Sequence, residues 1–208
     1  NILWQPEYVG KFSISADYYE ANIYITALSL GYEVDKLVDY ELLRSDDKFI
    51  KRLSSLASAS RSMWHGVDKS DDLLGLSIAT AWGFSFQGLK NKGEIWKFSS
   101  PKEGVTGWVD NWLLGYSLKD FPLKRKFAEE WINFTLSDDM QVYYLKSLGQ
   151  NPVTNTIITS LTEQQIKKFH VGDGIYIKEN LILWESLTRR QQNGFRALWL
   201  EAKGEVVN

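Results

Sequence analysis

Cysteine is absent from this 208-residue sequence, and histidine is scarce. Without cysteine the chain can form no disulfide, thiolate metal site or cysteine nucleophile, and it is compatible with an oxidising or a reducing compartment. The two histidines, His65 and His170, lie far apart and follow no spacing typical of metal ligands. We therefore expect neither a metal site nor a bound cofactor.

The sequence also lacks a strong excess of one charge, because 24 lysine and arginine residues face 26 aspartate and glutamate residues, for a formal charge of −2. Proteins that bind nucleic acid usually carry a basic face. Here the basic cluster Lys124–Lys126 is better explained as the solvated face of a helix. We expect no nucleic-acid partner.

Long apolar runs and targeting signals are missing too. No stretch approaches the roughly 20 apolar residues that a transmembrane helix needs. The chain opens at Asn1 without the basic and apolar regions of a signal peptide. This is expected of a mature form, or of a sequence that starts inside a longer protein.

Motifs of common catalytic sites are absent as well. The sequence contains no Gly-x-Ser-x-Gly, no P-loop and no Gly-x-Gly-x-x-Gly. Asp17 and Asp110 would serve as a glycosidase pair only at a suitable separation, which the sequence does not fix. A binding protein is therefore the favoured interpretation, and an enzyme is the remote alternative.

Aromatic side chains are what the sequence has in excess. Nine Trp, ten Tyr and ten Phe make up 14% of the chain. Aromatic rings suit flat or cationic ligands, because their faces attract cations and stack on flat groups. We expect most of them in the core and a minority at a binding surface.

The apolar pattern predicts strands that alternate with helices. Expected strands are Lys11–Ser15, Ser62–Trp64, Leu76–Trp82, Ile95–Phe98 and Val105–Leu114. Expected helices are Asp17–Leu30, Lys36–Leu56 (broken near Ser45–Asp47), Asp68–Leu74, Phe84–Asn91, Phe121–Leu136, Ser137–Leu148, Leu161–Phe169 and Thr188–Ala202, with Gly172–Leu183 irregular or weakly extended. This alternation predicts an α/β fold with a largely parallel sheet.

Three candidate site residues lie at the ends of predicted strands. Asp17 and Glu20 come just after the strand that ends at Ser15, and Trp82 ends the strand Leu76–Trp82. In open α/β sheets, ligands bind outside the carboxyl ends of the strands. Asp17 and Glu20 also have the spacing of a helix capping box, which is the favoured interpretation on spacing alone. The two roles are compatible, because a capping carboxylate can keep one oxygen for a ligand.

Trp108 and Asp110 lie two residues apart in the predicted strand Val105–Leu114 and would share one face of it. A carboxylate on a buried strand face needs a partner. An indole beside a carboxylate suits an organic ammonium group, because the ring attracts the cation and the carboxylate neutralises it. The alternative, a rim position paired with a lysine, stays open.

Four segments, in this order along the chain, resemble one known family. They are residues 3–15 (LWQPEYVGKFSIS), 27–32 (ALSLGY), 101–111 (PKEGVTGWVDN) and 128–134 (AEEWINF), of which the third is the most specific. They resemble the periplasmic spermidine/putrescine-binding proteins, which are type II solute-binding proteins of ABC transporters. The resemblance runs through almost the whole chain and implies the α/β type II periplasmic-binding-protein fold.

In that family two α/β lobes close on a linear polyamine, tryptophans sandwich its methylene chain, and carboxylates hold its ammonium groups. The resemblance implies ligand contacts for Asp17, Glu20, Trp82, Trp108 and Asp110. Gln150 follows Gly149 where the family often has a tyrosine, and Glu185 falls about where spermidine binders have a glutamine contact.

The family's chain has roughly a hundred more residues before the segment that matches Trp4, the size of a small domain. The resemblance therefore implies one complete lobe, residues 1–106 and 155–208, and a remnant of the first lobe, residues 107–154. The remnant would contain one strand and two helices without a sheet to complete.

An incomplete lobe should leave large apolar side chains exposed. We expect this of Trp112, Trp131, Phe134 and Tyr143. Because the strand Val105–Leu114 would also be unpaired, we expect a homodimer, a segment swap or association with a missing N-terminal piece.

The implied function is capture of polyamines outside the cytoplasm, in the periplasm or its equivalent, for the permease of an ABC transporter. Some relatives instead report polyamine levels to a membrane signalling protein, and the sequence does not separate the two. Another ligand (a different cation, a sugar or an amino acid) and a non-binding interaction module are further alternatives. A sugar site would need fewer carboxylates than Asp17, Glu20 and Asp110 provide.

Overall fold

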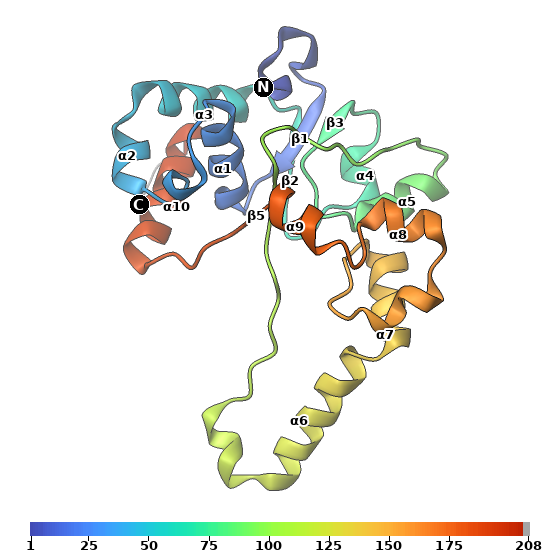
Figure 1. Ribbon diagram of the computed structural model, residues 1–208. Helices are drawn as coiled ribbons and strands as arrows, with labels where there is room; N and C mark the ends of the chain where they lie inside the picture. Colours follow the sequence, from blue (N-terminus) through green and yellow to red (C-terminus); the bar gives the residue numbers. More distant parts are fainter. Residues whose placement is uncertain (206–208) are drawn as a thin grey trace. The chain divides into compact units, whose positions relative to one another are not determined.

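A computed structural model describes residues 1–205, which divide into two compact units (Figure 1). Unit 1 contains Asn1–Gly107 and the segment that begins at Ile182, and unit 2 contains Trp108–Leu181. Residues 155–181 are therefore grouped with unit 2. The predicted division into lobes, 1–106 with 155–208 and 107–154, stays a prediction.

Unit 1 is built around a parallel sheet of short strands in the order β2-β1-β3. The strands are β1 (Phe12–Ser15), β2 (Ser62–Trp64) and β3 (Ile78–Ala79). Ser15 is level with Trp64 on one side of β1, and Phe12 is level with Ile78 on the other. A helix follows each strand, which confirms the predicted α/β fold with a parallel sheet.

The helices of unit 1 are close to those predicted. They are α1 (Tyr19–Ser29), α2 (Tyr40–Ser45), α3 (Asp47–Ala59), α4 (Ser70–Leu73), α5 (Ser85–Asn91) and α10 (Arg189–Ala202), with the 3-10 turns η1 (Ile2–Trp4), η2 (Pro6–Tyr8) and η3 (Val34–Lys36). The predicted break between α2 and α3 is confirmed at Asp46, whose Oδ1 accepts the Lys48 N–H at 2.8 Å and caps α3.

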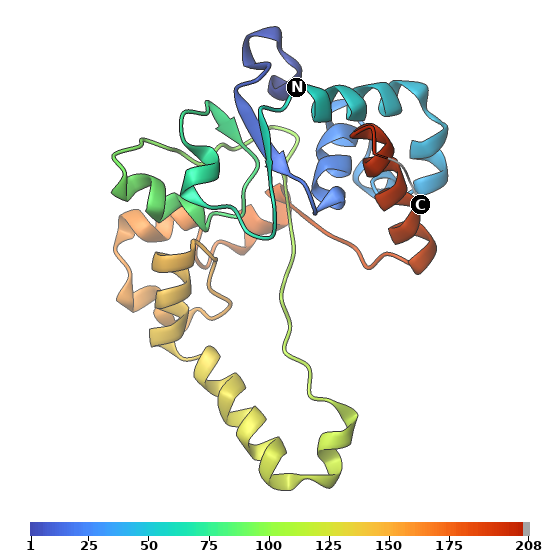
Figure 2. The same ribbon diagram turned by 180° about the vertical axis from the view of Figure 1, so that it is seen from behind.

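The main core of unit 1 lies between β1 and the helices α1, α3 and α10, which pack side by side in both views (Figures 1 and 2). All four residues of β1 are buried, as expected of a central strand. Phe12 and Ile14 alternate with two serines and pack in a cluster with Ile23, Phe49, Leu53, Phe195 and Trp199. A second cluster contains Trp64, Leu73 and Leu89.

Three predicted strands are shorter than expected or absent. β3 covers Ile78–Ala79 rather than Leu76–Trp82, and the predicted strand Ile95–Phe98 is wrong, because these residues are irregular. The predicted strand Val105–Leu114 is reduced to β4 (Val105–Gly107), which pairs with β5 (Leu181–Leu183) in a two-stranded sheet. The alternating pattern of side chains that predicted a strand continues beyond β4. The segment forms no strand there, because the described residues contain no further strand with which it pairs.

Unit 2 consists of helices and turns. They are η4 (Tyr116–Asp120), α6 (Pro122–Thr135), α7 (Asp138–Tyr143), the π-turn η5 (Tyr144–Leu148), η6 (Thr156–Ser160), α8 (Glu163–Phe169) and α9 (Gly174–Asn180). Its core cluster contains Leu145, Ile157 and Val171. The expectation that Gly172–Leu183 is irregular or weakly extended is wrong for Gly174–Asn180, because Asp173 accepts the Tyr176 N–H at 2.9 Å and caps α9 there. It is confirmed for Leu181–Leu183, which form the extended strand β5.

The expected exposure of large apolar side chains in unit 2 is confirmed. Trp112, Trp131, Phe134 and Tyr143 expose 59%, 48%, 50% and 52% of their surface. Across residues 1–205, no helix combines the length and the apolar character needed to cross a membrane.

Candidate ligand-binding site

The candidate site is built from the loops that follow β1, β2 and β3 at the carboxyl edge of the unit 1 sheet. The loop after β1 is fixed by its backbone. The Ala16 N–H donates to Trp64 O at 2.9 Å, and Ala16 O accepts from Trp199 Nε1 at 2.8 Å. Ser15 Oγ accepts from the N–H groups of Asp17 at 3.3 Å and Tyr18 at 3.1 Å. These hydrogen bonds fix the backbone from which the Asp17 side chain projects, and 46% of that side chain is exposed.

The predicted capping role of Asp17 is wrong. α1 begins at Tyr19 with Tyr18 as its N-cap residue, so Glu20 is the second helical residue, whereas a capping box requires the third. Asp17 Oδ2 instead accepts the Gly66 N–H at 2.8 Å, and Oδ1 lies 2.9 Å from His65 Nδ1. The Gly66 N–H, and after it His65, hold the pKa of Asp17 below its usual value, so this carboxylate is ionised at neutral pH.

Three aromatic rings cluster at the same edge of the sheet, and one of them belongs to Tyr18, the residue after Asp17 in the chain. The ring centroids of Tyr18 and Trp82 are 4.0 Å apart, and Trp64 lies 5.5 Å from Trp82 and 6.2 Å from Tyr18. Trp64 is buried, and its Nε1 donates to Thr80 O at 2.9 Å, which links β2 to the loop that carries Trp82. Tyr18 and Trp82 are half-buried, so part of their aromatic surface stays accessible at this edge of the sheet.

A buried carboxylate holds the loop of Trp82. Asp68 is 2% exposed, and its two oxygens accept the N–H groups of Trp82 and Ser85, each at 2.9 Å. The second bond also satisfies a backbone donor at the start of α5. Because each oxygen serves one donor, Asp68 fixes the backbone from which the Trp82 ring projects.

Glu20 supplies a second carboxylate from the first turn of α1. It is half-buried, and the Tyr19 hydroxyl donates a hydrogen bond to it. Burial raises the pKa of Glu20, and the bond from Tyr19 opposes that rise. Burial, followed by the charge of Glu20, raises the pKa of Tyr19 to about 12. A bound cation would favour the ionised form of Glu20.

Glu185 lies in the segment after β5, and its charge affects Tyr24, the same residue that the charge of Glu20 affects. Tyr24, one turn beyond Glu20 on α1, is 2% exposed, and its ring is edge-on to Trp184 at 6.0 Å. Burial, and then the negative charges of Glu20 and Glu185, raise the pKa of Tyr24. Glu20 and Glu185 therefore act on one buried hydroxyl.

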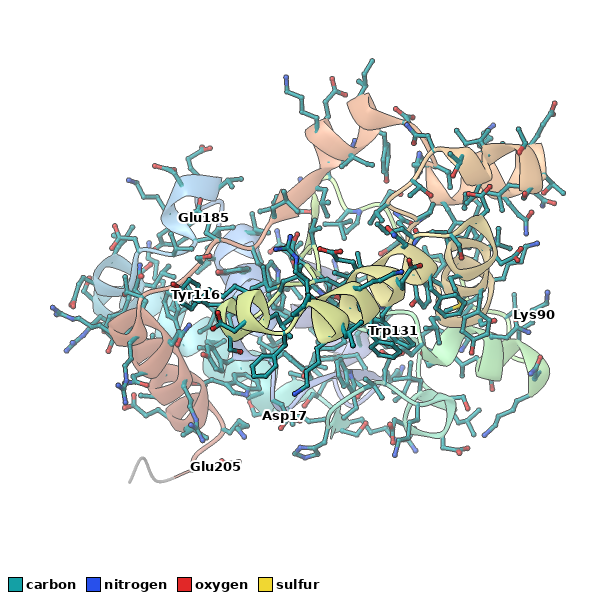
Figure 3. All side chains as sticks on the ribbon, turned by 90° about the horizontal axis from the view of Figure 1, so that it is seen from below. Asp17, Lys90, Tyr116, Trp131, Glu185 and Glu205 are labelled. Atoms are coloured by element: carbon teal, nitrogen blue, oxygen red, sulfur yellow. The ribbon has the colours of Figure 1, made fainter. Side chains whose placement is uncertain are left out.

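Four of the predicted site residues belong to unit 1: Asp17, Glu20, Trp82 and Glu185 (Asp17 and Glu185 are labelled in Figure 3). The other three, Trp108, Asp110 and Gln150, belong to unit 2. Trp108 and Asp110 follow β4 in a segment that forms no strand, so the predicted shared strand face is wrong. Ligand contacts by these three residues stay a prediction.

Sequence reasoning missed several residues that shape the site. His65 directly follows the predicted strand that ends at Trp64, and Tyr18 is the third residue after the predicted strand that ends at Ser15, so the strand-end rule applied to every strand would have found both. The role of Asp68 depends on a loop 14 residues further along the chain, and no local pattern indicates it.

The arrangement is suited to an organic cation. Carboxylates accept hydrogen bonds from ammonium groups, and aromatic faces attract both the charge and the adjoining methylene groups. A metal ion has less support, because residues 1–205 contain no group of three or more His, Asp or Glu side chains arranged to hold one.

Comparisons with known proteins agree with this architecture. Residues 1–180 match the family described as bacterial extracellular solute-binding protein. Among solved structures, the spermidine/putrescine ABC transporter substrate-binding protein PotD from Streptococcus pneumoniae is similar, with a TM-score of 0.63 and 16% sequence identity. The similarity covers 98% of this chain and 60% of that chain, so this chain spans less than two thirds of the length of PotD. The predicted periplasmic-binding-protein fold is confirmed, and the chain belongs to the family of bacterial extracellular solute-binding proteins.

Proposed function

We propose that this protein captures polyamines of the putrescine and spermidine type outside the cytoplasm and presents them to the permease of an ABC transporter. The observation that carries the proposal is the contact of Tyr18 with Trp82, 4.0 Å between ring centroids, in the loops that follow the strands of the sheet, one of which also carries the ionised carboxylate of Asp17. Glu20, in the first turn of α1, supplies a second carboxylate.

The chemistry of a polyamine fits these groups. Its ammonium ends need charged acceptors, and its methylene chain needs an apolar surface that tolerates a neighbouring cation. Asp17 and Glu20 are the acceptors, and Tyr18 and Trp82 form the apolar surface. Sugars also stack on tryptophan, but they do not require two carboxylates beside the ring.

Binding at Asp17 involves exchange of one partner for another. His65 Nδ1 lies 2.9 Å from Asp17 Oδ1, and both side chains are exposed. An ammonium group that bonds to Oδ1 displaces His65, whereas the Gly66 N–H keeps its bond to Oδ2. Binding also lowers the pKa of Glu20, which burial has raised, so we expect uptake of the amine to release protons from Glu20 in mildly acidic solution.

Two comparisons support the wider proposal. The family is one of extracellular solute-binding proteins, and PotD is by its name the substrate-binding protein of a spermidine/putrescine ABC transporter. In the proposed complex, Trp108, Asp110 and Gln150 add contacts from unit 2, and Glu185 adds one from unit 1. Association with a second copy of the chain is part of the proposal, because unit 2 exposes large apolar side chains.

The test is a titration with putrescine and spermidine, followed by tryptophan fluorescence. We expect a saturable change, because Trp82 lies in the cluster. Asp17→Asn removes a charged acceptor, which is worth about 1.5–3 kcal/mol, so the dissociation constant should rise roughly 10- to 100-fold. Trp82→Ala should reduce both the affinity and the signal.

Two controls make the titration specific. Asp35→Asn makes the same chemical change at an exposed carboxylate that contacts its neighbour Lys36, and it should leave the affinity unchanged. Butane-1,4-diol has the chain length of putrescine without its charges and should not bind. If neither amine gives a saturable change up to millimolar concentration, the proposal for this chain is wrong.

A further inference from the structure

His65 lies against the carboxylate on which the candidate site depends. It follows β2 directly, and its Nδ1 lies 2.9 Å from Asp17 Oδ1. The next residue, Gly66, donates its N–H to Asp17 Oδ2 at 2.8 Å. The loop after β2 therefore holds one oxygen of Asp17 with a backbone group, whose charge is fixed, and the other with an imidazole, the side chain whose charge ordinarily changes between about pH 5 and about pH 8.

The ring of His65 gains charge without leaving Asp17. Because the Asp17 carboxylate is ionised, it only accepts hydrogen bonds, so the Nδ1 that bonds to it carries a hydrogen. The proton that makes an imidazole cationic then adds to the other ring nitrogen, Nε2, and the bond at Nδ1 is kept. Protonation adds an attraction between opposite charges, so the ring holds Oδ1 more strongly in mildly acidic than in mildly alkaline solution.

Lys203, the residue after α10, is a second cation that acts on Asp17. Its Nζ bonds to Glu205 Oε1 at 2.8 Å, and its side chain is 14% exposed. A lysine ammonium ordinarily keeps its charge over the range in which histidine titrates. Lys203 therefore favours the ionised form of Asp17 throughout this range, and the change of charge beside Asp17 comes from His65.

Two carboxylates near this loop have other partners or a separate effect. Asp68, three residues after His65, gives its oxygens to backbone N–H groups of the Trp82 loop and of α5. Burial raises the pKa of Glu20, so acidification also removes the negative charge of this acceptor. That loss weakens amine binding in the same direction as protonation of His65, but it does not depend on His65. A substitution at His65 therefore separates the two effects.

We propose that His65 makes the affinity of this site depend on pH, because its protonated ring competes with the ammonium group of the ligand for Asp17 Oδ1. An ammonium group that takes Oδ1 breaks the contact with the ring, and this costs more when the ring is charged. A charged ring that stayed on Oδ1 would lie at most about 6 Å from the ammonium nitrogen, since each would be about 2.9 Å from the same oxygen. The site therefore holds an amine in neutral solution and releases it as the pH falls.

This inference rests on the proposed function, and it assigns regulation to the same carboxylate. A simpler role for His65 would be to orient Asp17 for the ligand. The two roles predict opposite results, because removal of an orienting ring weakens binding at every pH, whereas removal of a competing ring strengthens binding in acid. The effect is modest, since the side chains of His65 and Asp17 are 75% and 46% exposed and water screens their charges.

The first experiment measures the dissociation constant of putrescine by calorimetric titration at about pH 8 and about pH 5.5. His65→Asn keeps a side chain that donates to a carboxylate but takes up no proton in this range. At about pH 5.5 this variant should bind putrescine about threefold more tightly than the natural chain, and at about pH 8 the two should agree within about 1.5-fold. His65→Ala should also bind more tightly than the natural chain at about pH 5.5. Glu20 titrates in all three chains, so the difference between them belongs to His65.

Two further measurements test the mechanism. Binding heats in two buffers of different ionisation enthalpy give the number of protons released when putrescine binds. At about pH 6.5 the natural chain should release more protons than His65→Asn, because a ring that gives up Oδ1 to the ammonium group also gives up its proton more readily. In the background of Asp17→Asn, His65→Asn should no longer change the affinity at about pH 5.5, since the carboxylate for which the two cations compete is gone.

The matched control is His170→Asn, the same substitution at the other histidine of the sequence. His170 ends α8 in the left-handed region, at φ 51°, which asparagine adopts more readily than most residues. It belongs to unit 2, whereas the contact of His65 with Asp17 lies within unit 1. The ratio of the putrescine dissociation constants at the two pH values should be the same in this variant as in the natural chain.

Three outcomes would count against the inference. An equal dependence of the dissociation constant on pH in the natural chain and in His65→Asn would overturn it and leave the proposed function standing. Weaker binding by His65→Ala at about pH 5.5 would show that the ring orients Asp17 and does not compete for it. Absence of saturable putrescine binding at both pH values, in the natural chain and the variants alike, would overturn the proposed function and this inference with it.

Discussion

At the residue scale, Asp68 is the side chain on which the position of Trp82 depends most directly. Its two oxygens accept the N–H groups of Trp82 and Ser85 from a buried position. Asp68→Asn would point an amide N–H₂ at one of these donors, so one hydrogen bond is lost and a buried donor is left unsatisfied. We expect the free energy of unfolding to fall by about 1–3 kcal/mol, measured by urea denaturation followed by tryptophan fluorescence.

The matched control for Asp68 is Asp71→Asn in α4. Asp71 is exposed and pairs with Lys92 on the surface. Loss of such a pair should change the free energy of unfolding by less than about 1 kcal/mol. Equal effects of the two variants would show that Asp68 does not anchor the loop. Amine binding should weaken in Asp68→Asn and stay unchanged in Asp71→Asn.

Tyr24 offers a second test at the same scale. Its hydroxyl is buried without a hydrogen-bond partner among the described residues, near the charges of Glu20 and Glu185. Because a buried unsatisfied polar group costs about 1–3 kcal/mol, Tyr24→Phe should raise the free energy of unfolding by about 1 kcal/mol. Tyr32→Phe is the control and should lower it, because the Tyr32 hydroxyl donates to Asp46 Oδ2. Destabilisation by Tyr24→Phe would contradict this account and indicate a bonded hydroxyl.

The sequence predicted several of the residues at the candidate site, but it did not predict which other residues they contact. Asp17, Glu20 and Trp82 were found because they lie just after a strand or at its predicted end. The contact of Asp17 with His65 joins residues 48 apart in the sequence, so only the pairing of β1 with β2 reveals it. The spacing of Asp17 and Glu20 fits a capping box as well as a ligand site, and the sequence does not show that the helix begins one residue later than the capping box requires.

At the element scale, the cap of α3 gives stability that depends on pH. The Tyr32 hydroxyl, and then the Lys48 N–H, hold the pKa of Asp46 below the ordinary value of 3.8. A folded-state pKa below the unfolded value means that the contribution is present above pH 3.8 and is lost as the pH falls through the folded pKa. Asp46→Asn cannot titrate, so its loss of stability between about pH 6 and about pH 3 should be smaller than that of the natural chain.

Denaturation midpoints across this pH range measure the effect. Tyr32→Phe removes the largest cause of the lowered pKa and should shift the acid-sensitive range toward the ordinary aspartate value. If Asp46→Asn loses stability on acidification as steeply as the natural chain, the pH dependence has another origin.

Helices were predicted more reliably than strands, because a helix is stabilised by local bonds whereas a strand needs a partner. α3 and α10 were found from their apolar pattern, and α9 was missed although Asp173 is a recognisable cap. β4 stops at Gly107 despite continued alternation, since its pairing in the described chain is with the short strand β5. Pairing across the chain is information that one sequence does not carry.

At the scale of the whole molecule, the two units differ in how much apolar surface each buries on its own. Unit 1 has a large cluster around Phe12, Phe49 and Trp199, whereas the cluster of unit 2 is small and centres on Leu145. The sequence predicted the exposure of Trp112, Trp131, Phe134 and Tyr143, and their exposed fractions confirm that prediction. How the predicted lobes correspond to these units stays a prediction.

This contrast predicts two thermal transitions in scanning calorimetry, with unit 2 unfolding at the lower temperature. Leu145→Ala creates a cavity in unit 2 and should lower the first transition, at a cost of about 2–5 kcal/mol. Phe195→Ala, in the core of unit 1, should lower the second transition by a similar mechanism and leave the first in place. A single transition that both variants lower equally would show that the units unfold as one cooperative body and that the core of unit 2 extends beyond its own residues.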